Sequence, residues 1–113
     1  MTSAKQITLL LVTLIFSGTA SAAFTDGNEL QRWMVQDETQ GGNYFQSGLF
    51  RGYIGGVVDV GDGILFCIPT GVTRGQYVAV VAKYIKAHPE KWNQDASALV
   101  VNAMTKAFPC PKN

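Results

Sequence analysis

This sequence has few of the residues on which most enzymes and metal sites depend. It contains one histidine, His88, and two cysteines among 113 residues. A structural zinc site needs four closely spaced ligands, mostly Cys or His, and a nucleophilic side chain needs an adjacent base that a third group orients. No spacing in this chain supplies either arrangement. We therefore predict a protein that is not an enzyme and that holds no metal or cofactor.

The sequence also lacks an excess of charge of one sign. Nine Lys and Arg residues stand against eight Asp and Glu residues. One of the nine, Lys5, lies in a segment that we expect to be removed, and without it the net charge is zero. A neutral chain has no strong electrostatic attraction to nucleic acid or to anionic lipid. Nucleic-acid binding is therefore not expected.

No hydrophobic run is long enough for a membrane anchor. The apolar stretch from Ile7 to Phe16 is about half of the roughly 20 residues that a spanning helix requires. The small residues Thr19 to Ala22 follow it, and Ala20 and Ala22 form the pattern that signal peptidase recognises. We predict a signal peptide over residues 1–22, cleaved after Ala22, and a single exported, periplasmic domain over residues 23–113.

The two cysteines, Cys67 and Cys110, both lie in the expected mature chain. An exported protein meets an oxidising compartment, and an even number of cysteines suits a disulfide. Closing a loop of about 43 residues would stabilise the fold by about 4 kcal/mol in the chain-entropy model. The alternative is a pair of free thiols, one of them catalytic. It would need a nearby base, for which the chain offers only His88.

Four segments show helical periodicity, and they predict an all-α fold, a compact bundle of about four helices braced by one disulfide. The first begins near Asp26 or Asn28, either of which can cap a helix. Its apolar side chains recur at the i, i+3 and i+4 positions from Leu30. A Gly-rich turn over residues 39–43 separates it from the second segment, which runs from about Tyr44 to Val60.

The remaining two segments have clear boundaries. Thr73 and Gln76 form a capping box at the start of the third segment. His88 and the proline after it end this segment, because the residue before a proline is disfavoured in helical geometry. Asn93 or Asp95 caps the fourth segment. The apolar faces of these two helices contain Tyr77, Val80, Val81, Tyr84, Ile85, Ala96, Leu99, Val100, Ala103, Met104, Ala107 and Phe108.

Three glycines, Gly48, Gly52 and Gly56, recur every four residues and share one stripe of the second segment. Each costs about 1 kcal/mol relative to alanine inside a helix. We expect tight packing within the domain to compensate, with the approach of a partner chain as the alternative. The β-branched residues between Tyr53 and Val60 also fit a strand, but the helical spacing of the apolar residues favours a helix.

Two acidic residues, Asp59 and Asp62, lie near the C-terminal end of this predicted helix, where the helix dipole disfavours negative charge. They do not form a calcium loop, because the alternating oxygen ligands and the closing glutamate are missing. We expect a capping or ion-pair role to offset the cost. Contact with a partner is the alternative.

Several short motifs resemble one family in order and spacing. They are Gly-Tyr-Ile-Gly-Gly-Val-Val-Asp at 52–59, Cys-Ile-Pro at 67–69, His-Pro-Glu at 88–90 and Ala-Phe-Pro-Cys-Pro at 107–111. The chain is similar in this way to the Rap/Tai family, the immunity proteins of type VI secretion amidase effectors, from about Leu30 to Pro111. The resemblance implies a small, mostly helical periplasmic protein, often a homodimer, that blocks the active-site cleft of a peptidoglycan amidase.

The resemblance makes an amidase effector the expected partner. We expect the contacts to come from polar loops rather than from the apolar stripes. The alternative function is a periplasmic stress chaperone, activated by acid, or another non-catalytic binding protein. The candidate contact residues all lie at or near the ends of predicted helices: Asp59, Asp62, Arg74, Lys86, His88, Glu90 and Lys91.

Overall fold

The computed structural model describes residues 24–112 and contains four α-helices in this range. These are α1 (Gly27–Glu38), α2 (Tyr44–Gly61), α3 (Arg74–Ala87) and α4 (Ala96–Ala107), with a short 3-10 helix, η2 (Pro89–Lys91), between α3 and α4. Two isolated β-bridges and no strand occur in the described residues. The predicted all-α fold is confirmed, and the strand alternative for the second segment is wrong. The predicted signal peptide lies outside the described residues.

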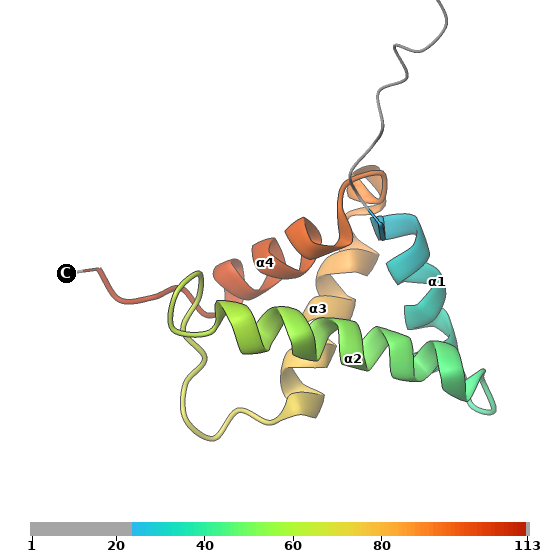
Figure 1. Cartoon of the computed structure of the whole chain (residues 1–113), viewed down its shortest axis with the longest axis horizontal. Helices are drawn as coiled ribbons and strands as arrows, with labels where there is room; N and C mark the ends of the chain where they lie inside the picture. Colours follow the sequence, from blue (N-terminus) through green and yellow to red (C-terminus); the bar gives the residue numbers. More distant parts are fainter. Residues whose placement is uncertain (1–23, 113) are drawn as a thin grey trace, which may run out of the picture.

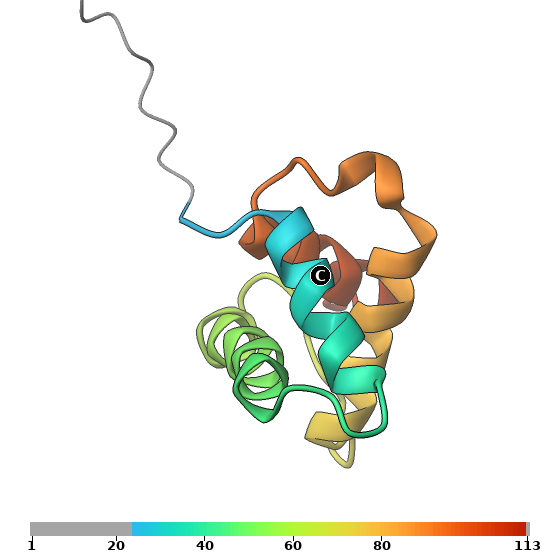
Figure 2. The same cartoon turned by 90° about the vertical axis from the view of Figure 1, so that its right-hand side faces the viewer.

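The helices pack as two neighbouring pairs, α1 with α2 and α3 with α4. In Figure 1, α2 crosses the front of the molecule, α4 lies beside it and α3 passes behind. Figure 2 looks nearly along α2 and shows α1 between α2 and α3. None of the described helices is long and apolar enough to cross a membrane. The fully buried side chains come from all four helices and from one loop: Leu30, Phe50, Ile54, Phe66, Val81, Ile85, Leu99, Val100 and Met104.

Local sequence signals determine where three of the helices begin. The Asp26 carboxylate accepts a hydrogen bond from the Glu29 backbone N–H at 2.9 Å, at the start of α1. The Asn43 side chain accepts the Gln46 N–H at 2.9 Å in the same way at the start of α2. At the start of α3, the predicted capping box of Thr73 and Gln76 is present in both directions. Such bonds satisfy backbone donors that have no partner inside the helix. The capping prediction for α4 is half right, because Asp95 occupies the N-cap position but its side chain makes no capping bond.

Backbone contacts replace that missing cap and join α4 to the beginning of α1. The Ala96 N–H donates to the Thr25 carbonyl at 3.0 Å, and the Gly27 N–H donates to the Gln94 carbonyl at 2.8 Å. Gly27 fits this close approach because it has no side chain. A Cβ atom there would lie 2.7 Å from the Trp92 carbonyl oxygen, closer than packed atoms tolerate. The start of the first helix and the start of the last are therefore fixed together.

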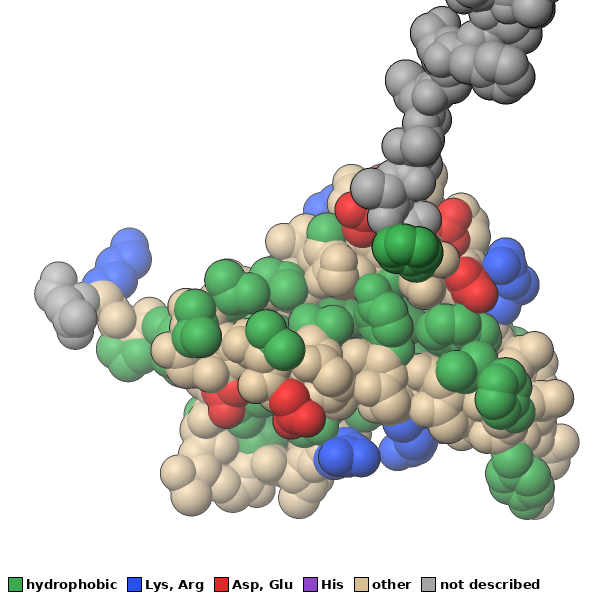
Figure 3. Space-filling view, viewed as in Figure 1, with side chains coloured by type: hydrophobic (Ala, Val, Ile, Leu, Met, Phe, Trp, Pro, Cys, Tyr) green, Lys and Arg blue, Asp and Glu red, His purple; other side chains and the backbone are tan. Residues whose placement is uncertain are grey.

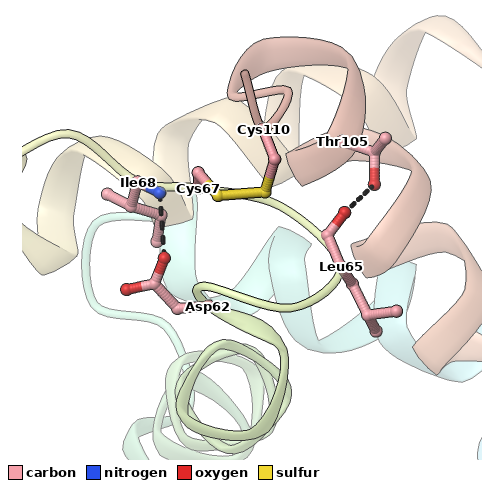
Figure 4. Close-up of a disulfide and its surroundings, with 6 residues drawn as sticks. All are labelled: Asp62, Leu65, Cys67, Ile68, Thr105 and Cys110. Carbon is pink, nitrogen blue, oxygen red and sulfur yellow. Dashed lines mark hydrogen bonds between the residues drawn. A yellow bond between two sulfur atoms is a disulfide. The ribbon is translucent and has the colours of Figure 1, made fainter. Parts of the chain in front are cut away.

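The predicted disulfide between Cys67 and Cys110 is present and links the α2–α3 loop to the segment after α4. Figure 4 shows how it lies among polar contacts of the same loop. The Asp62 carboxylate accepts the Ile68 N–H at 2.9 Å, and the Cys67 N–H donates to the Phe108 carbonyl at 2.8 Å. The bridge therefore fastens two segments that also pair through their backbones.

The prediction that the glycine stripe of α2 packs tightly inside the domain is wrong. No atom beyond the local helix lies within 4 Å of a Cβ built at Gly48, Gly52 or Gly56. The glycines that do meet close neighbours are Gly27, Gly42 and Gly61, and a Cβ at Gly61 would lie 2.7 Å from the Phe66 ring. The stripe lies on the open face of α2, away from the buried side chains Phe50, Ile54 and Val58. No contact made by the stripe itself offsets its cost in helix stability within the described chain.

We expect removal of the disulfide to destabilise the fold strongly. The bridge joins residues 43 apart in the sequence, which corresponds to about 4 kcal/mol of unfolding free energy in the chain-entropy model. Replacing both Cys67 and Cys110 with alanine should lower the free energy of unfolding by that order, as measured by urea denaturation. An unfolding midpoint equal to that of the oxidised wild type would contradict this assignment.

Two glycine substitutions should move stability in opposite directions. Gly56→Ala adds a methyl group in open space and improves helix propensity, so the free energy of unfolding should rise by up to about 1 kcal/mol. Gly27→Ala places the same methyl group against the Trp92 carbonyl, so the free energy of unfolding should fall by about 1–3 kcal/mol. Denaturation of both variants in parallel checks the pair. The measurement is made at a protein concentration low enough for the chain to be monomeric, where loss of stability in Gly56→Ala would show that this face of α2 is packed within the domain.

Candidate functional site

The described residues show no arrangement typical of catalysis. No group of three or more His, Cys, Asp or Glu side chains within residues 24–112 could hold a metal ion. The two cysteines are bonded to each other. His88 lies at the end of α3, where its Nδ1 atom is 3.0 Å from Glu90 Oε1. A partly exposed ring that pairs with an exposed carboxylate has no nucleophile to activate in this arrangement.

Four of the predicted contact residues gather at the C-terminal end of α3. The His88 ring lies against the Tyr84 ring, with 4.3 Å between their centroids. The Lys91 Nζ atom donates to the Tyr84 hydroxyl at 3.2 Å. The hydrogen bond from His88, together with the positive charge of that ring when protonated, lowers the pKa of the Glu90 carboxyl from its ordinary value. Lys86 points to the neighbouring helix, where it forms an ion pair with Glu38 at 2.6 Å.

The other three predicted contact residues lie near the C-terminal half of α2 and the start of α3. Asp62 is occupied by the Ile68 N–H, so it serves the fold of the loop. Arg74 packs over α2, with its Cζ atom 3.9 Å from the Cβ position of Gly55. Asp59 is exposed, and its carboxylate makes no hydrogen bond or ion pair with the described residues. Of the two acids, only Asp59 is free for a partner.

The predicted contact residues therefore do not form one surface. Arg74 and Lys86 are twelve residues apart on α3, which corresponds to about 18 Å along a helix that rises 1.5 Å per residue. A partner of ordinary size can span that distance, since a standard interface buries about 800 Å² on each side. The loop residues alone do not define such an interface.

An apolar groove between α2 and α4 is the surface that the sequence analysis missed. Its volume is about 490 Å³, and its lining includes Gly52, Gly56, Val57, Leu65 and Val101. Figure 3 shows hydrophobic side chains in a row along this boundary. The groove exists because the glycines of α2 carry no side chains that would fill it. The four-residue glycine period was the signal, but it was assigned to internal packing.

Exposed apolar side chains extend this surface at both ends of α2. Phe45, in the first turn, is 74 % exposed, and Val60, in the last turn, is 75 % exposed. Ile64, in the loop that follows, is 77 % exposed. An apolar groove with exposed apolar side chains near both of its ends favours an interaction site. The groove and these flanking residues are hereafter called the α2 face.

Comparison with models of known protein families assigns the chain to one family. Residues 26–110 match the model of the Rap1a immunity proteins, which covers all four helices and both cysteines. The chain belongs to the Rap1a immunity protein family. No curated protein matches the chain. Family membership supports an immunity role, and an immunity protein acts by binding a protein effector. The Rap1a family is generally non-catalytic.

Proposed function

We propose that this Rap1a family member is a periplasmic immunity protein that binds and inhibits a type VI-secreted peptidoglycan amidase. The observation that carries the proposal is the family match over residues 26–110. The disulfide supports a periplasmic site of action, because such bonds persist in oxidising compartments. A helical domain held by a disulfide, with an exposed apolar groove, suits a protein that inhibits its partner by binding to it.

The α2 face supports a second element of the proposal, a homodimer. A two-fold axis at Gly52 would place Gly48 of one copy opposite Gly56 of the other, because these residues are equally far from it in sequence. The glycines let two helices approach closely, and such self-complementary contacts are typical of symmetric dimers. The same antiparallel crossing brings Phe45 of each copy to Val60 of the other.

Charge favours the same arrangement. Asp59 lies near the C-terminal end of α2, where the helix dipole is unfavourable for an acid, and no basic residue occupies the last turn of α2. An antiparallel second copy places the positive N-terminal end of its own α2 close to this carboxylate. The dimer thus supplies a partner for the one acid of this region that lacks one in the described chain.

The inhibition proposal is tested with the amidase encoded beside this gene. Purified amidase should lose its activity on peptidoglycan when the chain is added at equal concentration, and the two proteins should elute together from a sizing column. The protein after thermal unfolding is the control for non-specific inhibition. Absence of both binding and inhibition for every neighbouring amidase would sink the proposal.

The dimer is tested by light scattering after size exclusion. The wild-type protein should have the mass of two copies, and Gly52→Arg should have the mass of one, because a long side chain then stands at the two-fold axis. Ala98→Arg is the matched control, since Ala98 is exposed on α4 and outside the groove. A dimeric Gly52→Arg protein, or a monomeric wild type, would show that α2 is not the interface.

A further inference from the structure

A second hollow lies between α3 and α4, on the side of α4 that faces away from the α2 face. Its volume is about 330 Å³, at the lower limit of the 300–1,000 Å³ typical of small-molecule sites. Three alanines, Ala87, Ala103 and Ala107, contribute to its lining. A hollow of this size lined by short aliphatic side chains fits one apolar side chain of a partner better than a cofactor.

The charged residues around this hollow are all cationic. Lys83 and Lys106 line it, and no acidic residue does. Neither lysine forms an ion pair within the described part of the chain, in contrast to Lys86, which is paired with Glu38. Glu90, the acid of the adjoining loop, is engaged by His88.

The part of the sequence that contributes this hollow also has an excess of positive charge. Five lysines and two acids lie in residues 83–113, although the whole chain carries a net charge of only +1. The hollow is thus in the basic part of the protein, because residues 1–82 carry four basic and six acidic side chains. Complementary charge steers a partner to such a site and selects its orientation.

Tyr84 adds a hydrogen-bond donor to the lining. Its hydroxyl oxygen accepts a bond from Lys91 at 3.2 Å, and its ring is held against His88. A phenol has one hydrogen to donate besides the lone pairs that accept. No hydrogen bond donated by the Tyr84 hydroxyl to another described residue accompanies this contact, so a carboxylate that reaches the hydroxyl finds a donor there.

We propose that this hollow binds an acidic segment of a protein partner. One aliphatic side chain of that segment enters between the alanines, and carboxylates beside it in the sequence meet Lys83 and Lys106. The identity of the partner as an amidase effector rests on the proposed function, but the chemistry of the segment does not. Nucleic acid is a poorer occupant. The Tyr84 ring, on which a base could stack, is already in contact with His88, and two lysines are few for binding a phosphate backbone.

The first experiment uses short peptides and the whole protein, labelled with ¹⁵N. Acetyl-Glu-Leu-Glu-amide should shift the backbone amide signals of Ala87, Ala103 and Ala107, with a dissociation constant on the order of 1 mM, since one side chain and two exposed ion pairs supply about 4 kcal/mol. Acetyl-Lys-Leu-Lys-amide is the matched peptide and should leave these signals unmoved. Equal shifts with both peptides, no shifts with either, or shifts that map to another surface would overturn the proposal.

The second experiment separates this proposal from the proposed function. The double variant Lys83→Glu, Lys106→Glu should lose the signal shifts caused by the acidic peptide. Its association rate constant with the amidase that the wild type inhibits should fall about tenfold or more, as expected when charges at the rim of an interface are reversed. Arg32→Glu, on the exposed side of α1, is the control and should change neither. Circular dichroism checks that both variants keep the helical fold.

The outcomes distinguish the two failures. Normal association of the double variant with an amidase that the wild type does inhibit would contradict the role of the hollow and leave the immunity function intact. If the wild type binds no amidase, the immunity function fails, and the peptide shifts alone decide whether the hollow recognises an acidic segment.

Discussion

The packing of one face of α2 against the other helices is the interaction on which the rest of the structure depends. Phe50 and Ile54 are fully buried at the centre of the molecule, and α2 contacts each of the other three helices. A helix fixed on one side in this way can leave its other side open without losing its position. That constraint creates the α2 face, because the three outward glycines weaken the helix intrinsically and tertiary contacts hold it.

Two sets of contacts link segments of the domain that are distant in the sequence. The disulfide and the backbone bond between Cys67 and Phe108 hold the loop after α2 to the end of α4. At the other end, the residues before α1 pair with those before α4, and Gly27 permits the contact. In a small domain with a limited core, these two links hold the α2 face and the hollow between α3 and α4 in fixed geometry.

Features that depend on residues close in the sequence, or on the chemistry of one residue type, could be predicted from the sequence. The capping box of Thr73 and Gln76 is a relation across three residues, and the disulfide follows from two cysteines in a chain with an expected export signal. The orientation of the glycine stripe was not predictable, because periodicity shows that residues share a face but not what that face meets. Likewise, the bond from Ile68 to Asp62 depends on the loop, and the basic hollow combines residues about 20 positions apart.

The uneven distribution of charge and apolar surface connects these features to the proposed role. An immunity protein must recognise one effector among many other proteins, so specificity matters as much as affinity. An open apolar helix face and a separate basic hollow offer two different chemistries on one rigid scaffold. This division is consistent with one surface for a second copy and another for the effector.

Survival of cells that export the amidase to their own periplasm tests the central claim most directly. Co-expression of the full chain should restore growth, and a version that lacks residues 1–22, and so stays in the cytoplasm, should not. Lysis despite equal amounts of the exported protein would contradict the immunity function. Equal protection by the version without residues 1–22 would contradict the periplasmic site of action.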